Sequence, residues 1–305
     1  MFSIEPYLEK KLSNKDKEKF MKEVEGKTCL ITGATSGIGS SAALKLSDMG
    51  ADICFIARSQ EKAKKLGEKI FKISGKEPLS IIADLSSQEG IRRAAEEFIQ
   101  SNKPIDVLLN NAGIMSLKRN VTVDGFEEVF AVNHLAYYSL TLRLLDRILE
   151  SSPARIVNVA SGAHSFIERM NFDDLNSENS FKTMQVYGQS KLANILFTKK
   201  LSNLIKSKGV TVNCLHPGFV STSLGTQNKS IIGNLLFNLA RPFARTSEKG
   251  AETPVYLCSS PEVSAISGEY FFDCKIKKAS DGAQNLSDAD KLWEVSSELT
   301  GISYP

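Results

Sequence analysis

Short apolar runs alternate with longer segments of helical periodicity along most of this 305-residue chain. The apolar runs occupy residues 27–32, 52–57, 79–83, 106–110, 155–160, 211–215 and 269–272. Helical periodicity marks the segments 37–49, 60–74, 87–101, 127–150 and 181–207. Continuously apolar strands, each followed by a helix, are typical of a parallel sheet that is covered on both faces. The alternation therefore predicts an α/β fold with one doubly wound parallel sheet of about seven strands.

The composition is that of an ordinary globular protein, with 42% hydrophobic and 24% charged residues and a net charge of +3. We find no linker, repeat or low-complexity stretch, so we expect a charged arm at 1–26 followed by one domain at 27–305. No basic cluster indicates nucleic-acid binding. The five cysteines form no C-x-x-C pair, and the three histidines lack metal-ligand spacing. We therefore expect buried, reduced thiols and no metal site.

The first 26 residues mix lysines with acidic residues and contain no arginine. They lack the apolar core of a signal peptide and the arginine-rich character of a transit peptide. The longest apolar stretch, at 231–240, falls well short of the ~20 residues that span a bilayer. We expect a soluble, cytoplasmic protein, with a peripheral membrane contact left open. The arm is interpreted as a solvated helical flank, with a subunit or membrane contact as the alternative.

The first predicted strand runs directly into the glycine-rich turn TGATSGIG at 32–39, and this turn opens a helical segment. Glycines allow a tight turn and a close backbone approach, and the N-terminus of the helix presents free N–H groups to a diphosphate. A glycine-rich turn is weak evidence by itself. Here it follows a strand and precedes a helix, and that context predicts a dinucleotide site on a Rossmann-type sheet.

The spacing of Gly33, Gly37 and Gly39 resembles the TGxxxGxG motif of the short-chain dehydrogenase/reductase family. Asp84 follows the third strand, NNAG at 110–113 follows the fourth, and Pro217-Gly218 with Thr222 resembles the family's PGxxxT. The resemblance covers nearly all of residues 27–300 and implies a nicotinamide cofactor. The cofactor-binding residues that it implies are Gly33, Thr35, Ser36, Gly37, Ile38, Gly39, Arg58, Asp84, Leu85, Asn111, Ala112, Gly113, Tyr187, Lys191, Pro217, Gly218, Val220 and Thr222.

The end of the second strand distinguishes the two nicotinamide cofactors. An enzyme that uses NAD usually carries an acidic residue there, which binds the ribose 2′-hydroxyl. This chain has Ala57 followed by Arg58. An arginine can pair with a 2′-phosphate, which an acidic residue would repel. We therefore predict NADP(H), with Ser36 and Ser59 as additional hydrogen-bonding groups; the alternative is that Arg58 is an ordinary surface arginine.

Tyr187 and Lys191 lie four residues apart in the helical segment VYGQSKLANILF and so share one helix face. They resemble the YxxxK pair of the family, Ser161 matches its catalytic serine, and Asn133 matches its fourth catalytic residue, which organises a proton-relay water. The resemblance implies that Tyr187 is the acid and base and that Ser161 holds the carbonyl oxygen. It also implies that Lys191 holds the nicotinamide ribose.

The physical chemistry of a phenol explains why a lysine accompanies it. A free tyrosine has a pKa near ~10, so it exchanges protons near neutrality only if its phenolate is stabilised. A cation about 4 Å away contributes up to ~4 kcal/mol at an effective dielectric near 20, before its own desolvation is counted. We therefore expect Lys191 to lower the pKa of Tyr187. No histidine is placed to make a serine triad, and G-x-S-x-G is absent, so Ser161 is not expected to be a nucleophile.

The long insertion between Ser161 and Tyr187 is expected to loop out beside the site. With VNHLAYYSLT and KLANILFTKKL, it makes the chain similar to the retinol dehydrogenase and WW-domain oxidoreductase branch, whose members act on retinoids, steroids and other lipid-like alcohols and aldehydes. The apolar stretch within 226–247 matches the substrate-covering segment of the family, although it is equally compatible with a core helix or a subunit contact. His164 and His216 are interpreted as polar turn residues near the cofactor.

Three functions remain open. The first is an NADP(H)-dependent oxidoreductase that interconverts an apolar carbonyl compound and its alcohol, mainly as a reductase. The second is a carbonyl reductase for small polar substrates, which a narrow or polar lid would favour. The third is a non-catalytic NADP-binding regulator, which a missing catalytic residue would have favoured. Relatives pair through helices equivalent to 127–150 and 181–207, so a homodimer or homotetramer is a further expectation.

Overall fold

The computed structural model describes residues 23–220 and 245–304. Most of the predicted arm at 1–26, most of the predicted substrate-covering segment at 226–247, and Thr222 lie outside these residues.

The described residues form one eight-stranded sheet with the order β3-β2-β1-β4-β5-β6-β7-β8. All neighbouring strands are parallel except β7 and β8, which are antiparallel. The strands are β1 Thr28–Thr32, β2 Asp52–Ala57, β3 Leu79–Ile82, β4 Val107–Asn110, β5 Ala154–Val159, β6 Val210–Leu215, β7 Tyr270–Phe272 and β8 Lys275–Ile276. Each of the seven predicted runs forms a strand. The eighth was not predicted, because two exposed residues carry no apolar signal.

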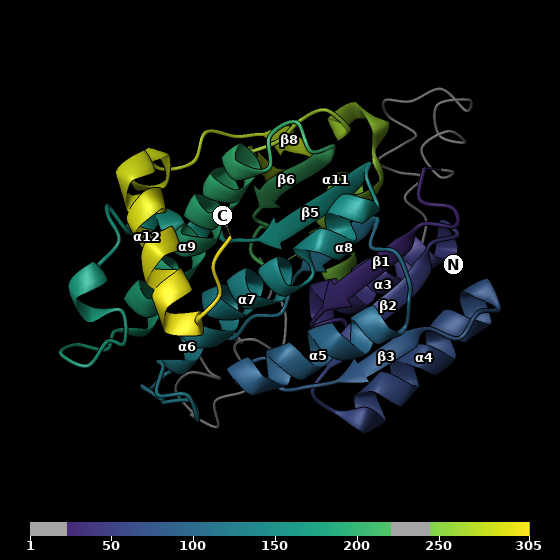
Figure 1. Ribbon diagram of the computed structural model, residues 1–305, viewed down its shortest axis with the longest axis horizontal. Helices are drawn as coiled ribbons and strands as arrows, with labels where there is room; N and C mark the ends of the chain where they lie inside the picture. Colours follow the sequence, from purple (N-terminus) through teal and green to yellow (C-terminus); the bar gives the residue numbers. More distant parts are fainter. Residues whose placement is uncertain (1–22, 221–244, 305) are drawn as a thin grey trace.

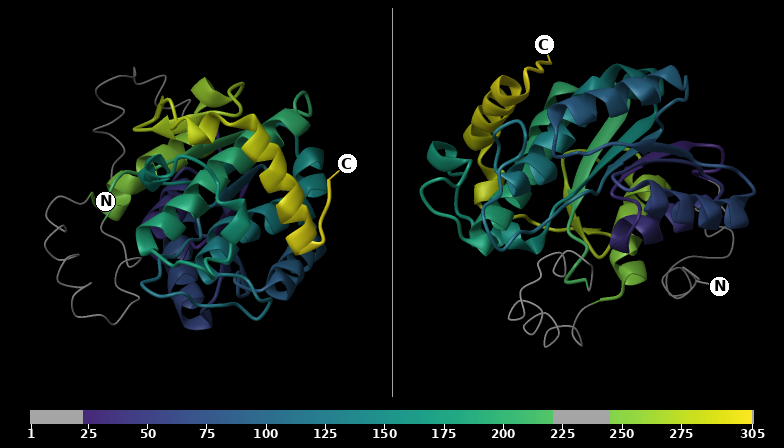
Figure 2. Two further views of the ribbon diagram at one scale, coloured as in Figure 1. Left: turned by 90° about the vertical axis from the view of Figure 1, so that its left-hand side faces the viewer. Right: turned by 90° about the horizontal axis from the view of Figure 1, so that it is seen from below.

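Helices cover both faces of the sheet, as predicted (Figures 1 and 2). Helices α3 and α11 pack together on one face with α4 beside α3, and α5, α7 and α9 lie on the other, where α12 packs against α9. The α-helices are α3 Gly37–Asp48, α4 Gln60–Ser74, α5 Gln88–Gln100, α6 Glu128–Phe130, α7 Ala136–Arg143, α8 Leu145–Glu150, α9 Thr183–Leu204, α11 Ser247–Ser259 and α12 Leu286–Thr300. Short 3₁₀ turns are η2 Gly162–Phe166, η3 Phe172–Asp174, η6 Pro261–Val263 and η7 Gly282–Gln284.

The apolar strands contribute side chains to the hydrophobic core on each face of the sheet, because successive side chains point to opposite faces. In β1, Cys29 and Ile31 join the core under α3 and α11, whereas Leu30 joins the core under α5 and α7. In β4, Leu108 and Leu109 are divided in the same way. A strand that must be apolar on both sides reads as a continuous apolar run, which explains why the sequence signal was clear.

The predicted helical segment 127–150 is not one helix. It is divided into α6, a π-helical turn η1 at Ala131–Leu135, α7 and α8. Asn133 lies inside the π turn, and its side chain makes two hydrogen bonds to the backbone of Ile114. Single π turns inside helices often occur at functional sites. Here the wider turn accommodates Asn133, which faces the loop that contains Ile114. Apolar periodicity in the sequence does not reveal such a turn.

Candidate active site

A cleft of about 680 Å³ opens at the carboxyl ends of the central strands. It lies across β1 and β4, where the strand order reverses, and this is where open α/β sheets bind ligands. Of the predicted site residues, all but two line this cleft: Gly33, Thr35, Ser36, Gly37, Ile38, Gly39, Arg58, Asp84, Leu85, Asn111, Ala112, Gly113, Ser161, Tyr187, Lys191, Pro217, Gly218 and Val220. The exceptions are Asn133, which lies buried behind the cleft, and Thr222, which is outside the described residues.

The glycine-rich turn has no room for side chains at two of its positions. A Cβ on Gly33 would lie 2.7 Å from the Ala112 Cα, and a Cβ on Gly39 would lie 2.4 Å from both the Gly33 carbonyl oxygen and the Asn111 amide nitrogen. Contacts this short are essentially never made by real Cβ atoms, so these glycines are required by close packing of the turn against the β4 loop.

The N-terminus of α3 is arranged to receive an anion. Its N-cap residue, Ser36, makes no side-chain capping hydrogen bond, and the first turn has no acidic residue. By contrast, Ser59 caps α4 and Ser87 caps α5 through their hydroxyl groups. The first N–H groups of a helix bind phosphate well, and here they face the cleft through Ser36, Gly37 and Ile38.

The β4 loop is fixed to the glycine turn by Thr32 at the end of β1. The Thr32 hydroxyl accepts hydrogen bonds from the backbone nitrogens of Asn111 and Ala112, at 2.9 and 3.0 Å. The Asn111 side-chain amide donates to the carbonyls of Thr32 and Gly33. Asn111 therefore holds the two loops together, which explains why an asparagine stands at this position.

Two cations lie at the β2 end of the cleft. Arg58 and Ser59 line it as predicted, and Lys62, in the first turn of α4, lines it as well. Sequence reasoning missed Lys62, although its place one turn after the arginine was a usable signal. The Asp84 carboxylate accepts a hydrogen bond from the Ser86 nitrogen at 2.9 Å and, among residues 23–220 and 245–304, is the only acidic side chain lining the cleft.

Ser161 and Tyr187 meet at the other end of the cleft. Ser161 follows β5 and caps the 3₁₀ turn η2 through its hydroxyl, while Tyr187 lies in the first turns of α9. Burial raises the pKa of Tyr187, and a hydrogen bond with the Ser161 side chain partly offsets that rise. The phenol is therefore protonated at neutral pH, so the expected lowering of its pKa is not found.

Lys191 explains this difference. Its side chain is only 3% exposed, and its Nζ donates to the Val159 carbonyl oxygen at 3.0 Å, 5.7 Å from the centre of the Tyr187 ring. Burial lowers the pKa of Lys191 to about 7. The ammonium is therefore only partly charged at neutral pH, because the desolvation that the sequence argument left uncounted is large.

Asn133 connects the loop after β4 to the helix that carries the tyrosine and lysine. Its side-chain oxygen accepts from the Ile114 nitrogen at 2.8 Å, and its amide group donates to the Ile114 carbonyl and to the Ser190 hydroxyl. The Ser190 hydroxyl in turn donates to the Tyr187 carbonyl at 2.8 Å. Asn133 therefore fixes the position of α9 relative to the cleft.

The two histidines near the cleft have structural partners on both sides. His164 is buried and lies 2.7 Å from the Ser161 carbonyl, and its other ring nitrogen accepts from the Ser280 nitrogen. His216 lines the cleft, and its Nδ1 accepts from the Gly218 nitrogen at 3.1 Å. Burial lowers the pKa of His216 to about 4, so the ring is neutral at physiological pH.

Large apolar side chains surround the mouth of the cleft beside Ser161 and Tyr187. Phe166, Met184 and Phe219 line the cleft and are 72%, 50% and 55% exposed. Phe166 lies in the insertion between Ser161 and Tyr187, and Met184 lies at the end of that insertion, in the first turn of α9. The insertion therefore lies beside the site, as predicted. Exposed apolar groups that gather at one opening indicate an apolar ligand or partner.

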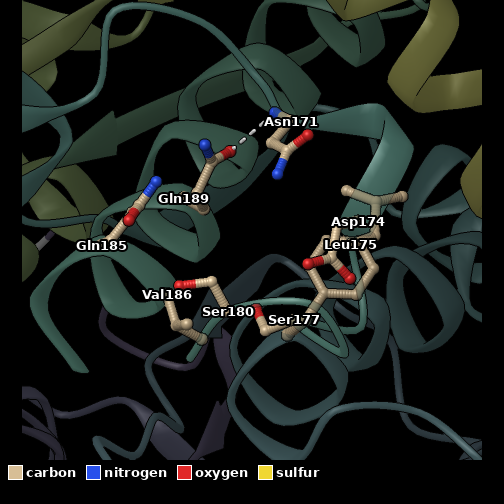
Figure 3. A pocket seen from close by; sticks show the side chains of 9 residues that line it. Asn171, Asp174, Leu175, Ser177, Ser180, Gln185, Val186 and Gln189 are labelled. Atoms are coloured by element: carbon tan, nitrogen blue, oxygen red, sulfur yellow. Dashed lines mark hydrogen bonds between the residues drawn. The ribbon is translucent and has the colours of Figure 1, made fainter. Parts of the chain in front are cut away.

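A second, much smaller pocket lies between this insertion and α9 (Figure 3). Its volume is about 30 Å³, enough for roughly one water molecule. The Gln189 side chain accepts from the Asn171 nitrogen, and the Asp174 carboxylate accepts from the nitrogens of Glu178 and Asn179. Its polar groups are thus used in folding the insertion, and we assign no function to the pocket.

Comparison with known proteins identifies the family. The family model for short chain dehydrogenases matches residues 27–231. The chain belongs to the short-chain dehydrogenase family. Human retinol dehydrogenase 14 is 41% identical over 295 residues, with 92% of this chain and 88% of the relative covered. The chain is therefore an NAD(P)-dependent oxidoreductase that resembles the retinol dehydrogenases.

Solved structures agree with this assignment. An uncharacterised protein from Mycobacterium paratuberculosis superposes with a TM-score of 0.74 and 28% identity, covering 93% of this chain and 98% of that one. A protein described as an NAD(P)-dependent gluconate 5-dehydrogenase from Beutenbergia cavernae, which contains NADP, has a TM-score of 0.66 and 28% identity over 83% and 96% of the two chains.

The residues present fit the nicotinamide cofactor of short-chain dehydrogenases. Gly33 and Gly39 leave no room for side chains in the glycine turn, and no side chain caps α3 in place of a phosphate. In the described part of the chain, no group of three or more His, Cys, Asp or Glu side chains could hold a metal ion. Within the same residues, no helix is both long and apolar enough to cross a membrane.

Proposed function

We propose that this short-chain dehydrogenase is an NADP(H)-dependent reductase of apolar aldehydes or ketones, which are retinal-like or otherwise lipid-derived. The observation that carries the proposal is the apolar mouth of Phe166, Met184 and Phe219 beside the hydrogen-bonded Ser161 and Tyr187. An apolar substrate that covers these side chains removes their exposed surface from water, which favours binding by about 25 cal/mol per Å² of buried apolar area.

We assign the cofactor-binding roles from the lining of the cleft. Arg58, Ser59 and Lys62 would hold a 2′-phosphate, because two cations and a hydroxyl surround that end of the cleft. The N-terminus of α3 would bind the diphosphate. When bound, the cofactor supplies a hydride to the carbonyl carbon. Lys191 would hold the nicotinamide ribose and help to orient that end of the cofactor against the substrate.

The remaining chemistry is proton transfer, which the chain's own residues would perform. Tyr187 donates its phenolic proton to the carbonyl oxygen, and Ser161 holds that oxygen by a hydrogen bond. Lys191 in its charged form stabilises the phenolate that results. Asn133 holds the π turn beside the lysine, where a water molecule can return a proton to Tyr187.

The raised pKa of Tyr187 supports reduction as the main direction. At neutral pH the phenol carries the proton that reduction requires, whereas oxidation of an alcohol requires the phenolate as a base. The environment of this one side chain thus favours reduction independently of the state of the cellular cofactor pool.

Consumption of NADPH by the purified protein tests the proposal, with retinal, medium-chain aldehydes and small polar carbonyl compounds as substrates and NADH as a parallel cofactor. We expect the fastest turnover with NADPH and a long apolar aldehyde. Tyr187→Phe should abolish turnover, and Tyr138→Phe is the matched control, because that hydroxyl donates to the Ile302 carbonyl away from the cleft. Turnover only with small polar substrates would favour a carbonyl reductase for such compounds. NADPH binding without any turnover would favour a non-catalytic NADP-binding regulator.

Arg58→Ala tests the choice of cofactor separately. Charge-assisted hydrogen bonds contribute about 1.5–3 kcal/mol, so the Kd for NADPH should rise by roughly tenfold to a hundredfold. The Kd for NADH should stay unchanged. Equal effects on the two cofactors would refute the assignment of Arg58 to the 2′-phosphate.

Association of subunits and contact with membranes remain predictions. The stacking of Phe197 on Trp293 covers part of α9 with α12 of the same chain. A homodimer or homotetramer would therefore use the remaining surface of α7, α8 and α9. Light scattering of the purified protein measures the assembly directly, and flotation with vesicles tests a peripheral membrane contact.

A further inference from the structure

Behind the Pro217–Gly218 turn, an ion pair links two segments that are distant in sequence. Arg245 donates through its guanidinium group to both carboxylate oxygens of Asp273, in the turn between β7 and β8. The Arg245 backbone nitrogen donates to the Phe219 carbonyl oxygen at 2.7 Å, and Val220 forms a bridge with Arg245. The arginine therefore fixes the backbone that leaves the Pro217–Gly218 turn.

A stack of planar groups continues from this ion pair to the turn. The Arg245 guanidinium lies 4.9 Å from the centre of the Phe272 ring, and the Phe272 ring stacks on His216 with centroids 4.1 Å apart and planes within 5°. The His216 Nδ1 then accepts a hydrogen bond from the Gly218 nitrogen. We call Arg245, Asp273, Phe272 and His216 the arginine clasp.

The Arg245 side chain also lies close to the Pro217–Gly218 turn. Gly218 has a φ of +85°, and a Cβ built on it would lie 2.8 Å from the Arg245 Nε. The turn thus lies close to the Arg245 side chain and is hydrogen-bonded to the His216 ring. Any larger residue at position 218 would collide with Arg245, so the turn packs closely against the arginine side chain.

The Pro217–Gly218 turn, which the clasp holds, lines the end of the cleft that contains Ser161. His216, Pro217 and Gly218 all line the cleft, and the His216 ring lies 3.7 Å from the place where a Cβ on Gly162 would stand, next to Ser161. Arg58 and Lys62 lie at the β2 end of the cleft, next to Ser59 and after a different strand from the clasp. The clasp can therefore affect one end of a dinucleotide without affecting the other.

We propose that Arg245 and Asp273 are positioning residues for the nicotinamide end of the cofactor, acting through Phe272, His216 and the Pro217–Gly218 turn. The inference rests on the proposed function and deepens it, because it divides the affinity for the cofactor between two ends of the cleft. Arg245 and Asp273 are 29% and 46% exposed, so their pairing adds little to global stability. The two hydrogen bonds to Asp273 and the stacking on the Phe272 ring instead fix the orientation of the Arg245 guanidinium group.

The test compares two ligands in two variants. NADPH spans the whole cleft, whereas adenosine 2′,5′-bisphosphate lacks the nicotinamide half. In Arg245→Lys, which keeps the charge but loses the planar fork, the Kd for NADPH should rise by about tenfold. The same rise is expected in Asp273→Asn, whose side chain tolerates the φ of +50° at this position. The Kd for adenosine 2′,5′-bisphosphate should stay unchanged in both.

Arg169→Lys is the matched control. Arg169 makes a similar two-pronged contact with Asp288 but lies away from the cofactor cleft. This variant should leave both Kd values unchanged. In steady-state kinetics, the clasp variants should also raise the KM for NADPH more than they lower kcat.

The outcomes separate the inference from the proposed function. If the clasp variants raised the Kd for both ligands equally, or for neither, the inference would be wrong. NADPH binding by the wild type would still support the proposed function. A wild-type protein that bound neither ligand would overturn both. Unchanged melting temperatures would confirm that the variants are folded.

Discussion

At the scale of single residues, Lys191 connects stability and function. Its ammonium group is buried with one carbonyl acceptor, and Asn194 donates to the same carbonyl oxygen. The folded-state pKa of about 7 lies below the ordinary value of 10.5, so between these values the unfolded chain binds more protons. Stability contributed by this group therefore rises with pH, and the folded state is penalised most below pH 7.

Lys191→Met should stabilise the protein and inactivate it. A methionine fills a similar volume without a buried charge, and the Val159 carbonyl keeps Asn194 as a donor. Changes of this kind contribute about 0.5–2 kcal/mol to the free energy of unfolding. Denaturant unfolding at several pH values measures the gain, which should be largest below pH 7 and shrink above it. A destabilised variant would show that the lysine is stabilising where it lies.

The same pKa predicts how turnover depends on pH. If charged Lys191 stabilises the developing phenolate, carbonyl reduction should be fastest below pH 7 and fall as pH rises through about 7. The loss between pH 6 and pH 9 should be on the order of a hundredfold, since a nearby charge in this environment is worth several kcal/mol and the charged fraction of Lys191 falls by about that factor. The residual activity of Lys191→Arg should not fall in that range, because arginine stays charged. A flat wild-type profile would contradict the role given to Lys191.

At the scale of elements, helices α3 and α4 each contain an internal glycine, but only the one in α3 lacks room for a side chain. Gly39 in α3 has the Gly33 carbonyl oxygen and the Asn111 amide 2.4 Å from an added Cβ, whereas Gly67 in α4 has only the Pro78 ring, at an ordinary 3.7 Å. Helix propensity alone favours alanine by about 1 kcal/mol at both positions. Close packing against the β4 loop reverses that preference only in α3.

Gly39→Ala should therefore lose NADPH affinity by more than about tenfold and lower the melting temperature, because the turn and Asn111 must move apart. Gly67→Ala is the control, and it should raise the free energy of unfolding by about 0.5–1 kcal/mol with unchanged activity. Titration with NADPH and thermal unfolding measure both effects. If the two variants behaved alike, tight packing of the turn would not be what the cofactor site requires.

At the scale of the whole molecule, the thiols are buried in the sheet and in the segments packed against it. All five cysteines are buried, as the sequence predicted. Burial raises the pKa of Cys54, Cys214 and Cys258 to about 12, so the reactive thiolate is scarce in the folded protein. The single tryptophan, Trp293 in α12, stacks on Phe197 of α9.

These features predict a cooperative unfolding transition. A thiol reagent should modify none of the five cysteines in the folded protein and all five after denaturation. The midpoint of thiol exposure in urea should coincide with the midpoint of Trp293 fluorescence, because both depend on the same packed layers. Separate midpoints would show that α12 detaches before the sheet opens.

The amino-acid sequence by itself determined the order and type of seven strands, because strands that are covered on both faces must be apolar throughout. It also determined the cleft-lining residues that stand at the ends of strands, since parallel strands bring their carboxyl ends to one edge. Gly33, Arg58 and Ser161 were placed in this way, whereas Tyr187 was placed by its spacing from Lys191 on one helix face.

The tertiary structure alone decided what depends on distance and burial. The π turn around Asn133 follows from hydrogen bonds to a loop that is remote from it in sequence. The pKa values of Tyr187 and Lys191 follow from desolvation, which sequence spacing does not measure. The arginine clasp joins residues after β6 to the β7–β8 turn, and only the folded sheet brings them together. Local patterns specify elements, whereas contacts between elements set the electrostatics and the shape of the site.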